Sequence, residues 1–336
     1  MTDHAHPSAA ALLRVEDLHT HFRVPKARGW GKETLRALNG VSFSLERGKT
    51  LGLVGESGCG KSTLGRTLLG LYEPTSGTVV LAGQDLARMN RRRPRKFRRL
   101  MQVVFQDPYA SLDPRMNVHE IVAEPLRING EYRRERVDEL IELVGLPAAA
   151  AGRKPADFSG GQRQRIAIAR ALALNPELLI LDEAVSALDV SIQAQIINLL
   201  KRLQRELGVA YLFISHNLAV VRHVSDHVAV MYLGRIVEMG PGAQIFEAPR
   251  HPYTQALLSD VPVPDPGKRR GTTRLILRGE LPNPVKPPSG CAFRSRCPKA
   301  QPECAAAVPP LRAQTHADHV AACFFPSPTA SARSTT

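Results

Sequence analysis

A glycine-rich loop between an apolar run and a helical run is the feature that most limits the fold of this chain. Residues 55–63 read Gly-Glu-Ser-Gly-Cys-Gly-Lys-Ser-Thr and match the phosphate-loop pattern G-x-x-x-x-G-K-[ST]. The apolar run before them, residues 50–54, predicts a buried strand, and residues 62–69 predict a helix. These flanks disfavour a glycine turn that holds no ligand, and together they predict an α/β nucleotide-binding core.

The loop residues have distinct expected roles in holding a nucleotide. The glycines let the backbone turn its N–H groups toward the α- and β-phosphates, where the helix dipole adds positive charge. We expect Lys61 to reach the β- and γ-phosphates and the Ser62 hydroxyl to bind Mg²⁺. The predicted phosphate-binding residues are Gly55, Glu56, Ser57, Gly58, Cys59, Gly60, Lys61, Ser62 and Thr63.

A second motif, Ser-Gly-Gly-Gln-Arg at residues 159–163, lies far downstream of the loop. A helix that opens with these residues offers another set of backbone donors to a phosphate. One nucleotide cannot engage both sets within a single compact domain, so the two motifs together imply a second copy of the domain. The second predicted set comprises Ser159, Gly160, Gly161 and Gln162.

The run Leu-Leu-Ile-Leu-Asp-Glu at residues 178–183 predicts a buried strand that ends in two acids. The carboxyl ends of strands deliver side chains into the crevice where open α/β sheets bind ligands. Asp182 fits the carboxylate on the Mg²⁺ side, and Glu183 fits the base that orients the attacking water. Alone, an Asp-Glu pair fits a surface turn equally well, and the phosphate loop in the same chain favours the catalytic interpretation.

These motifs together resemble those of the ATP-binding subunit of an ABC transporter. The resemblance implies that Gln106 ligates Mg²⁺ or water and senses a membrane partner, and that Asp189 belongs to a D-loop beside the nucleotide. It also implies that His216 is a switch histidine that contacts the γ-phosphate, which makes Glu183, His216 and Gln106 the catalytic set. A lone histidine beside an apolar strand is usually structural, and only the accompanying motifs favour a catalytic role.

Three positions qualify the resemblance. Phe22 stands where the family places an aromatic ring that stacks on adenine, although a lone phenylalanine in a strand is more often a core residue. Phe158 stands where leucine is more usual, and Ala184 stands where proline often follows the glutamate. Neither position touches a ligand in the family, so both departures leave the expected chemistry intact.

Further segments resemble the oligopeptide/dipeptide importer branch of this family, and within it the second of the two ATPase subunits. The likeness covers about residues 12 to 325 and implies a homologous ATPase subunit as a heterodimer partner, two transmembrane permease subunits and an extracytoplasmic substrate-binding protein. It places the chain at the cytoplasmic face of the cell membrane. The segments that carry it are residues 185–194, 231–238, 250–258 and 279–284.

Composition is compatible with this expectation. No run of eighteen apolar residues occurs, and residues 1–6 have neither a basic leader nor a long apolar core, which argues against secretion. The net charge of +14 invites a nucleic-acid or anionic-membrane interpretation, and residues 91–99 contain seven basic side chains. Only one aromatic residue interrupts that run, so base stacking is not indicated. A solvated surface near the membrane is favoured over docking on a membrane partner, and both are favoured over nucleic acid.

The pattern of apolar runs predicts a doubly wound α/β core, a small antiparallel sheet and a helical subdomain. The resemblance implies that these are the RecA-like core of a P-loop NTPase fold, its antiparallel β-subdomain and the ABC helical subdomain. We expect the nucleotide-binding domain at residues 12–260, with the helical subdomain at about 85–160, a C-terminal appendage at 261–325 and a disordered tail at 326–336. Short β-rich runs are expected up to about residue 84, ending in the phosphate-loop helix. The other predicted elements are helices within 132–146, at 163–174 and at 190–207, and strands at 178–182 and 210–214.

Four of the five cysteines fall in the proline-rich C-terminal segment, namely Cys291, Cys297, Cys304 and Cys323. Thiols gathered where no hydrophobic core is obvious suggest a staple, and a reducing compartment favours a metal centre over disulfides. Their spacing matches neither the zinc-knuckle nor the ferredoxin pattern, so zinc, an iron–sulfur cluster and unligated thiols all stay open, with His316 and His319 as further zinc ligands. The resemblance to the peptide-importer branch implies a [4Fe–4S] cluster. Cys59, inside the loop, is most simply a small filler.

The sequence thus predicts an ATPase that couples ATP hydrolysis to the uptake of di- or oligopeptides across the cytoplasmic membrane. A soluble ABC ATPase of DNA repair or translation is the alternative from another class. Such chains usually carry long coiled-coil insertions or two fused copies, and the interval between Gln106 and Ser159 is too short for that. Import of a related solute such as nickel stays open, because other chains recognise the solute.

Overall fold

The computed structural model of the chain describes residues 11–26, 30–86, 95–260, 279–314 and 316–328. Contacts divide the described chain into two compact units. Unit 1 contains residues up to Glu16, then Ser42–Thr50 and Thr78–Leu212. Unit 2 contains Asp17–Val41, Leu51–Gly77 and the residues from Phe213 onward. The predicted domain boundaries do not coincide with this division, and they stay a prediction.

Unit 1 contains parallel strands that are buried on both faces. Strand β6 (Met101–Val104) pairs in parallel with β7 (Leu178–Asp182), and β8 (Ala210–Ile214) is the next strand beside β7. Every residue of β7 and β8 is buried, which explains why both strands are unbroken apolar runs. The strands predicted at 178–182 and 210–214 are confirmed with those bounds.

The other strands of unit 1 form an antiparallel sheet in the order β2-β1-β4-β5. Strands β1 (Ala11–Pro25) and β2 (Lys32–Glu46) are 15 residues long each, and unit 1 holds one end of each strand. Strands β4 (Ser76–Leu81) and β5 (Gln84–Asp85) follow the phosphate-loop helix in the chain. The prediction of short strands that end in that helix was therefore wrong in both length and order.

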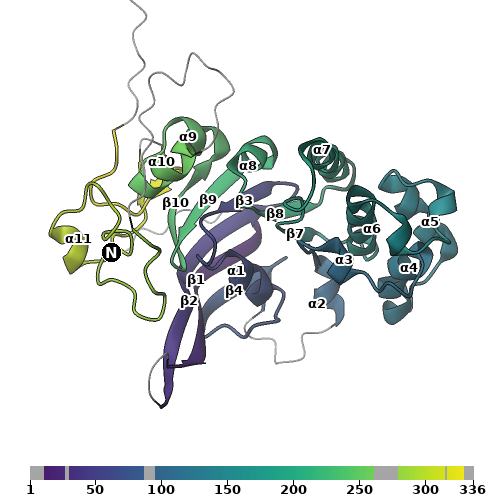
Figure 1. The fold of residues 1–336 in the computed structure, drawn as a ribbon, viewed down its shortest axis with the longest axis horizontal. Coiled ribbons are helices and arrows are strands. Elements are labelled where there is room, and N and C mark those ends of the chain that lie inside the picture. Colours follow the sequence, from purple (N-terminus) through teal and green to yellow (C-terminus); the bar gives the residue numbers. More distant parts are fainter. Residues whose placement is uncertain (1–10, 27–29, 87–94, 261–278, 315, 329–336) are drawn as a thin grey trace, which may run out of the picture. The chain divides into compact units, whose positions relative to one another are not determined.

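Helices make up most of unit 1 between β6 and β8 (Figure 1). Helix α7 (Val190–Leu207) is confirmed with the predicted bounds. The helix predicted within 132–146 is α5 (Arg134–Leu143), whose buried residues Val137, Leu140 and Ile141 follow helical spacing. The remaining helices are α2 (Arg95–Leu100), α3 (Pro108–Ser111), α4 (Val118–Asn129) and α6 (Gly160–Leu172), with short 3₁₀ turns at Ala148–Ala150 and Pro155–Asp157.

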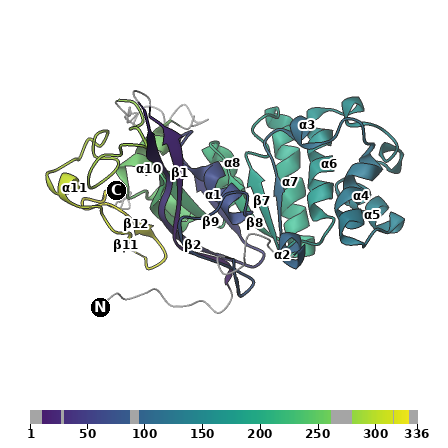
Figure 2. The ribbon, with the colours of Figure 1, turned by 90° about the horizontal axis from the view of Figure 1, so that it is seen from below.

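Unit 2 contains the other end of the parallel sheet. Strand β3 (Thr50–Val54) pairs in parallel with β9 (His227–Tyr232), and β9 pairs antiparallel with β10 (Arg235–Pro241). The sheet continues through the C-terminal strands β12 (Val320–Ala321) and β11 (Arg312–Ala313), which lie together in Figure 2. Residues 312–313 and 320–321 of the C-terminal segment are therefore paired with the sheet.

The helices of unit 2 follow its loops and strands along the chain. Helix α1 follows the phosphate loop, α8 follows β8, and α9 and α10 follow β10. The short helix α11 carries Cys304. Their bounds are α1 Lys61–Leu68, α8 Leu218–Val224, α9 Gly242–Glu247, α10 Pro252–Ser259 and α11 Glu303–Ala306.

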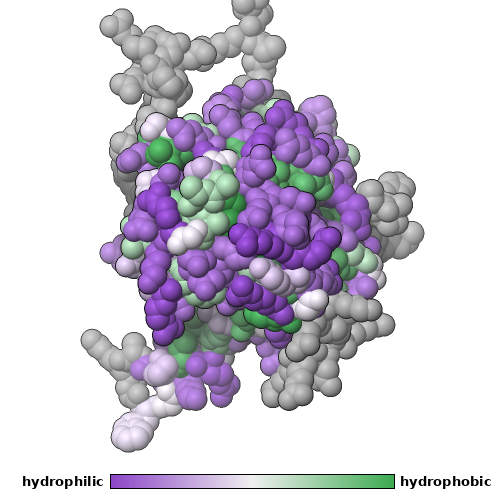
Figure 3. Space-filling view, turned by 90° about the vertical axis from the view of Figure 1, so that its right-hand side faces the viewer, coloured by the Kyte–Doolittle hydropathy of each residue, from purple (hydrophilic) through white to green (hydrophobic). Residues whose placement is uncertain are grey.

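The surface on the side of α4 and α5 is mostly hydrophilic (Figure 3), in keeping with the exposed charged residues of α5. Among the described residues, no helix combines the length and the apolar character that crossing a membrane requires. Several predictions from the sequence lie wholly or partly outside the described residues. They concern the N-terminal residues 1–6, the basic residues 91–94, and positions 329–336 of the expected tail.

Candidate nucleotide-binding site

The phosphate loop follows β3 directly and forms a backbone cradle in unit 2. Gly60, with φ of 110°, is the residue before α1, and a Cβ at this position would lie 2.5 Å from the carbonyl oxygen of Ala37. A Cβ on Gly55 would lie 2.3 Å from the carbonyl oxygen of Met231. Only glycine fits at either position, so these two glycines allow the loop to pass close to the backbone at Ala37 and Met231.

Lys61 is folded back over this cradle. Its Nζ donates to the carbonyl oxygens of Gly55 at 2.7 Å and Glu56 at 3.0 Å, and the residue is 5% exposed. The ammonium group is therefore held by carbonyl oxygens of the loop itself, which keeps a positive charge beside the loop backbone. Ser62, the second residue of α1, is half-buried beside it.

Cys59 is a buried residue of the loop without reactive character. Burial raises the pKa of its thiol above the usual value, and the nearby Lys61 charge only partly opposes this effect. The side chain is 1% exposed. Its backbone N–H donates to the carbonyl oxygen of Glu56 at 3.3 Å, while the sulfur fills space inside the loop.

His216 emerges close to the loop in unit 2. The backbone N–H of Ser215 donates to the carbonyl oxygen of Leu53 at 3.2 Å, which holds the end of β8 beside β3. His216 follows immediately and is exposed. Since both strands end at the same edge, the structure brings the predicted switch histidine and the phosphate loop to one side of unit 2.

Phe22 is half-buried on β1 and has an aromatic neighbour that the sequence did not reveal. The rings of Phe22 and Tyr72 lie 5.0 Å apart between centroids at an interplanar angle of 79°, an edge-to-face contact. Arg66 of α1 donates to the Tyr72 hydroxyl at 3.1 Å. The predicted adenine-stacking residue is therefore part of an aromatic pair, and Tyr72 could have been singled out only by its position just after the phosphate-loop helix.

In unit 1, the structure places Gln106, Asp182 and Glu183 at one edge of a parallel sheet. Val104 of β6 is in register with Leu181 of β7, so the residues that follow each strand leave the sheet together. Asp182 is 8% exposed, whereas Gln106 is exposed. The three side chains predicted for metal and water binding thus share one strand edge, as expected for parallel strands.

Glu183 has an unusual backbone conformation. Its φ is 51°, in the left-handed region that non-glycine residues seldom adopt. The turn is held by Ser186, whose backbone N–H and hydroxyl both donate to the carbonyl oxygen of Glu183, at 3.0 and 2.8 Å. Ala184 is buried. A strained residue fixed in this way is typical of a catalytic position.

The second motif forms the beginning of α6. Ser159 is the N-cap: its hydroxyl accepts from the Gln162 backbone N–H at 3.4 Å, and the Gln162 side chain accepts from the Ser159 backbone N–H at 3.0 Å. The helix predicted at 163–174 therefore begins earlier, because this capping box sets its start. Gly161 packs on α7, where a Cβ would lie 2.4 Å from Cγ2 of Ile192. Ser159, Gly160 and Gln162 are exposed, and so is Asp189, the N-cap residue of α7.

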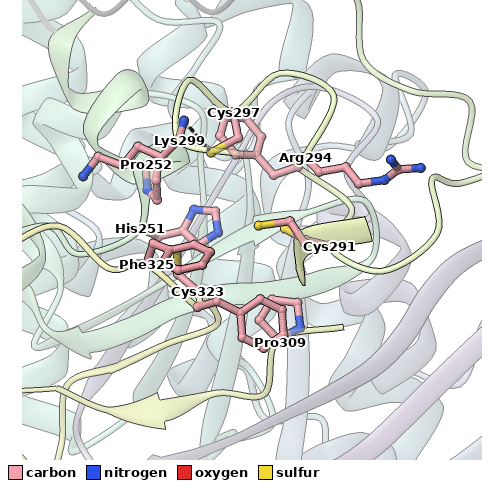
Figure 4. Close-up of a pocket in the computed structure, with 12 residues that line it drawn as sticks. His251, Pro252, Cys291, Arg294, Cys297, Lys299, Pro309, Cys323 and Phe325 are labelled. Atoms are coloured by element: carbon pink, nitrogen blue, oxygen red, sulfur yellow. Dashed lines mark hydrogen bonds between the residues drawn. The ribbon is translucent and has the colours of Figure 1, made fainter. Parts of the chain in front are cut away.

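The four C-terminal cysteines line one pocket in unit 2 (Figure 4). All four are free thiols, and Phe293, Pro252 and His251 also line the pocket. Burial, reinforced by the neighbouring cysteines, raises the pKa of Cys291 and Cys297, and it raises the pKa of Cys323 to about 11. Within the described residues, no three His, Cys, Asp or Glu side chains are arranged as ligands of a metal ion.

His319 is not part of this pocket. Its Nε2 lies 2.7 Å from Oε1 of Glu238, a carboxylate that is fully buried on β10. The suggestion that His319 supplies a zinc ligand beside the cysteines is corrected by this contact, because the ring nitrogen is used by a different buried partner. His316 is exposed.

Comparison with known proteins identifies the family of the chain. Residues 38–186 match the family model "ABC transporter", and residues 237–304 match "Oligopeptide/dipeptide transporter, C-terminal region". The chain is 53% identical over 323 residues to the oligopeptide transport ATP-binding protein AppF of Bacillus subtilis (strain 168), covering 94% of this chain and 97% of that protein. It is 54% identical over 307 residues to the di/tripeptide transport ATP-binding protein DppF of Pseudomonas aeruginosa (strain UCBPP-PA14), covering 90% and 94%.

Among solved structures, the chain is similar to the ATP-binding cassette MJ0796, described as a dimeric structure of a post-hydrolysis state bound to ADP and Pi. The TM-score is 0.58 at 28% sequence identity, and the match covers 68% of this chain and 98% of that chain.

Proposed function

Because the chain belongs to the family of ATP-binding subunits of oligopeptide/dipeptide ABC importers, we propose that its predicted site residues bind and hydrolyse ATP. The chain is an ABC transporter ATPase with the P-loop cassette fold. The observation that carries the residue assignment is that each unit gathers its predicted site residues at one strand edge: the phosphate loop and His216 in one, Gln106, Asp182 and Glu183 in the other.

In this proposal the phosphate loop supplies binding and most of the positive charge. The loop N–H groups and the dipole of α1 hold the α- and β-phosphates, and Lys61 exchanges its bonds to the loop carbonyls for bonds to the β- and γ-phosphates. Phe22, supported by Tyr72, stacks on the adenine ring. Ser62, Asp182 and Gln106 have the oxygen donors that Mg²⁺ prefers, and the ion when bound neutralises charge on the phosphates.

The remaining residues act on the attacking water. Glu183 accepts a proton from the attacking water while the water oxygen forms a bond to the γ-phosphorus. The bond between the γ-phosphorus and the bridging oxygen breaks, which gives ADP and inorganic phosphate. Its fixed backbone turn holds the carboxylate for this task. His216 contacts the γ-phosphate and distinguishes ATP from ADP.

The exposed start of α6 completes the site of another subunit in this proposal. Ser159 and Gln162 form a capping box with each other at the N-terminus of the 13-residue helix α6. Both residues are exposed, so the positive end of the helix dipole faces solvent. The similar structure of MJ0796 is described as dimeric. The partner is a homologous ATPase subunit, and the pair works beneath two permease subunits at the cytoplasmic face of the membrane, with an extracytoplasmic protein delivering the solute.

We also propose that the cysteine pocket holds a metal centre, with a [4Fe–4S] cluster preferred over zinc. Four thiols line one pocket, and burial together with the neighbouring cysteines raises the pKa of Cys291, Cys297 and Cys323, a cost that a bound cation would remove by stabilising the thiolates. The donor set is sulfur only, which suits iron–sulfur chemistry, and His319 is committed to Glu238. The pocket must tighten on loading, because the thiols are not in a ligand arrangement without the metal.

The transported solute is tested with the assembled transporter. The chain is purified with its permease subunits and partner ATPase, reconstituted in liposomes, and supplied with the binding protein loaded with labelled dipeptides, longer peptides or nickel. We expect ATP-dependent peptide uptake that a Lys61→Ala variant abolishes. Uptake of nickel without peptide uptake would replace the peptide assignment, and ATP hydrolysis stimulated by nucleic acid instead would favour the soluble class of ABC ATPase.

A further inference from the structure

A residue of the cysteine-bearing C-terminal segment, Arg296, contacts the phosphate loop. Arg296 forms a two-pronged ion pair with Glu56, the second residue of the loop: Nη1 lies 2.8 Å from Oε2 and Nη2 lies 3.1 Å from Oε1. The Arg296 side chain is 8% exposed and that of Glu56 is 26% exposed. Planar bidentate pairs of this kind are geometrically specific, unlike single contacts between flexible surface charges.

Packing of its neighbours fixes Arg296. Its backbone N–H donates to the carbonyl oxygen of Phe293 at 3.0 Å, in a turn that also bears Cys291 and Cys297. The Phe293 ring is buried against Tyr232 and Tyr253, with ring centroids 5.3 and 5.4 Å away. The Arg296 guanidinium also lies over the Tyr232 ring, 6.0 Å from its centroid, so the turn and this contact both restrict the side chain that pairs with Glu56.

Tyr253 makes a second contact with the same loop residue. The backbone N–H of Glu56 donates to the Tyr253 hydroxyl at 2.9 Å, and Tyr253 is fully buried at the start of α10. The carbonyl oxygen of Glu56 in turn accepts from Lys61 Nζ. The side chain, N–H and carbonyl of Glu56 are therefore all engaged, and the partners of the side chain and the N–H come from the C-terminal part of the chain.

We propose that Arg296 and Tyr253 are positioning residues for ATP binding: they fix Glu56, preshape the phosphate loop and neutralise a carboxylate beside the triphosphate. This inference rests on the proposed role of the loop. Without Arg296, the Glu56 carboxylate would be an unpaired negative charge in a loop that must receive a polyanion. The C-terminal segment would then act on nucleotide affinity as well as on the cysteine pocket.

If the pair acts through charge, removing Arg296 and removing the Glu56 carboxylate should shift the Kd for Mg-ATP in opposite directions. If the pair is only structural, both changes should shift the Kd in the same direction. In the full-length protein, Arg296→Met should raise the Kd for Mg-ATP by about tenfold, the scale of leaving a partner charge unpaired. Glu56→Gln should lower the Kd, because it removes the negative charge beside the phosphates, and the double variant should recover most of the loss. Arg296→Lys should recover part of it, because the charge stays but the planar fork is lost. Tyr253→Phe should weaken binding without changing any charge.

Arg312→Met is the matched control, since it removes the same charge from an exposed position on β11 of the same unit and should leave the Kd unaltered. Binding is measured by titration with a fluorescent ATP analogue, with folding checked by thermal melting. A double variant as weak as Arg296→Met, or an equal loss in Arg312→Met, would overturn the inference. Failure of the wild type to bind ATP, or full binding by Lys61→Ala, would instead overturn the proposed role of the loop.

Discussion

Nε2 of His319 lies 2.7 Å from Oε1 of Glu238, a carboxylate on β10, and both side chains are buried. Glu238 also accepts from the backbone N–H groups of Arg250 at 2.6 Å and His251 at 2.8 Å. Three donors thus satisfy one buried carboxylate, and one of them comes from the C-terminal segment. The pairing of β12 with β10 surrounds this contact and fastens the segment to the sheet.

Loss of that contact should loosen the C-terminal segment. His319→Ala leaves a buried carboxylate with one donor fewer, which costs about 1–3 kcal/mol of stability. We expect a lower melting temperature and faster proteolysis within residues 279–328. His316→Ala, three residues earlier and exposed, is the control and should melt like the wild type. Equal melting of the two variants would mean that the pair does not fasten the segment.

The exposed start of α6 predicts a specific defect in dimer formation. Ser159→Arg places a bulky cation where the phosphate of the partner's nucleotide is proposed to dock, while the phosphate loop in unit 2 is untouched. ATP-dependent association with the partner ATPase, measured by sedimentation, should be lost, and the Kd of the isolated subunit for ATP should not change. Leu207→Arg adds the same charge at the exposed far end of α7 and should associate normally. A matching loss of ATP affinity in isolated Ser159→Arg would place the motif in its own site.

Cys59 should be dispensable for chemistry. Burial raises the pKa of its thiol, so the thiolate is scarce at neutral pH and becomes populated only at more alkaline pH than for an ordinary cysteine. Cys59→Ala should therefore keep ATP affinity within about twofold, because the small buried side chain only fills space and the backbone bond to Glu56 is retained. Iodoacetamide should not label Cys59 in the folded protein at pH 7. Rapid labelling there, measured by mass spectrometry of the peptide, would contradict a buried filler.

The cysteine pocket predicts a chromophore. Protein purified without oxygen should be brown, absorb near 400 nm, roughly where thiolate-to-iron charge transfer occurs, and contain about four irons per chain. Replacing any of Cys291, Cys297, Cys304 or Cys323 by serine should bleach it, whereas Cys59→Ser should keep the colour. One equivalent of zinc in colourless protein would replace the cluster by the zinc alternative. Absence of any metal would leave the four as ordinary buried thiols.

Local sequence was sufficient for the elements that are bounded by clear signals. β7, α7 and β8 have the predicted bounds because each is a continuous apolar or periodic run with a distinct end, such as Gly208 after α7. Helix α5 ends at Leu143, inside the predicted range, because Gly145 adopts a φ of 73° two residues later. For α6 the capping box Ser-x-x-Gln was present in the sequence and could have given the correct start.

Long-range relationships were beyond local patterns. The 15-residue length of β1 and β2 depends on pairing partners and not on their own composition. Arg296 and Glu56 are 240 residues apart, and nothing in either segment alone indicates the other. The grouping of four cysteines into one pocket was predicted from their density, whereas the ligand arrangement depends on a metal and cannot be obtained from spacing.

The central claim is that Glu183 orients and deprotonates the attacking water on ATP held by the phosphate loop. The most direct measurement is ATP binding and ATP hydrolysis by the purified transporter carrying Glu183→Gln, which keeps the size of the side chain and removes the base. The account predicts unchanged ATP binding and a turnover lower by about 10²–10⁴-fold, the scale of a general base. Hydrolysis at the wild-type rate in this variant would contradict it.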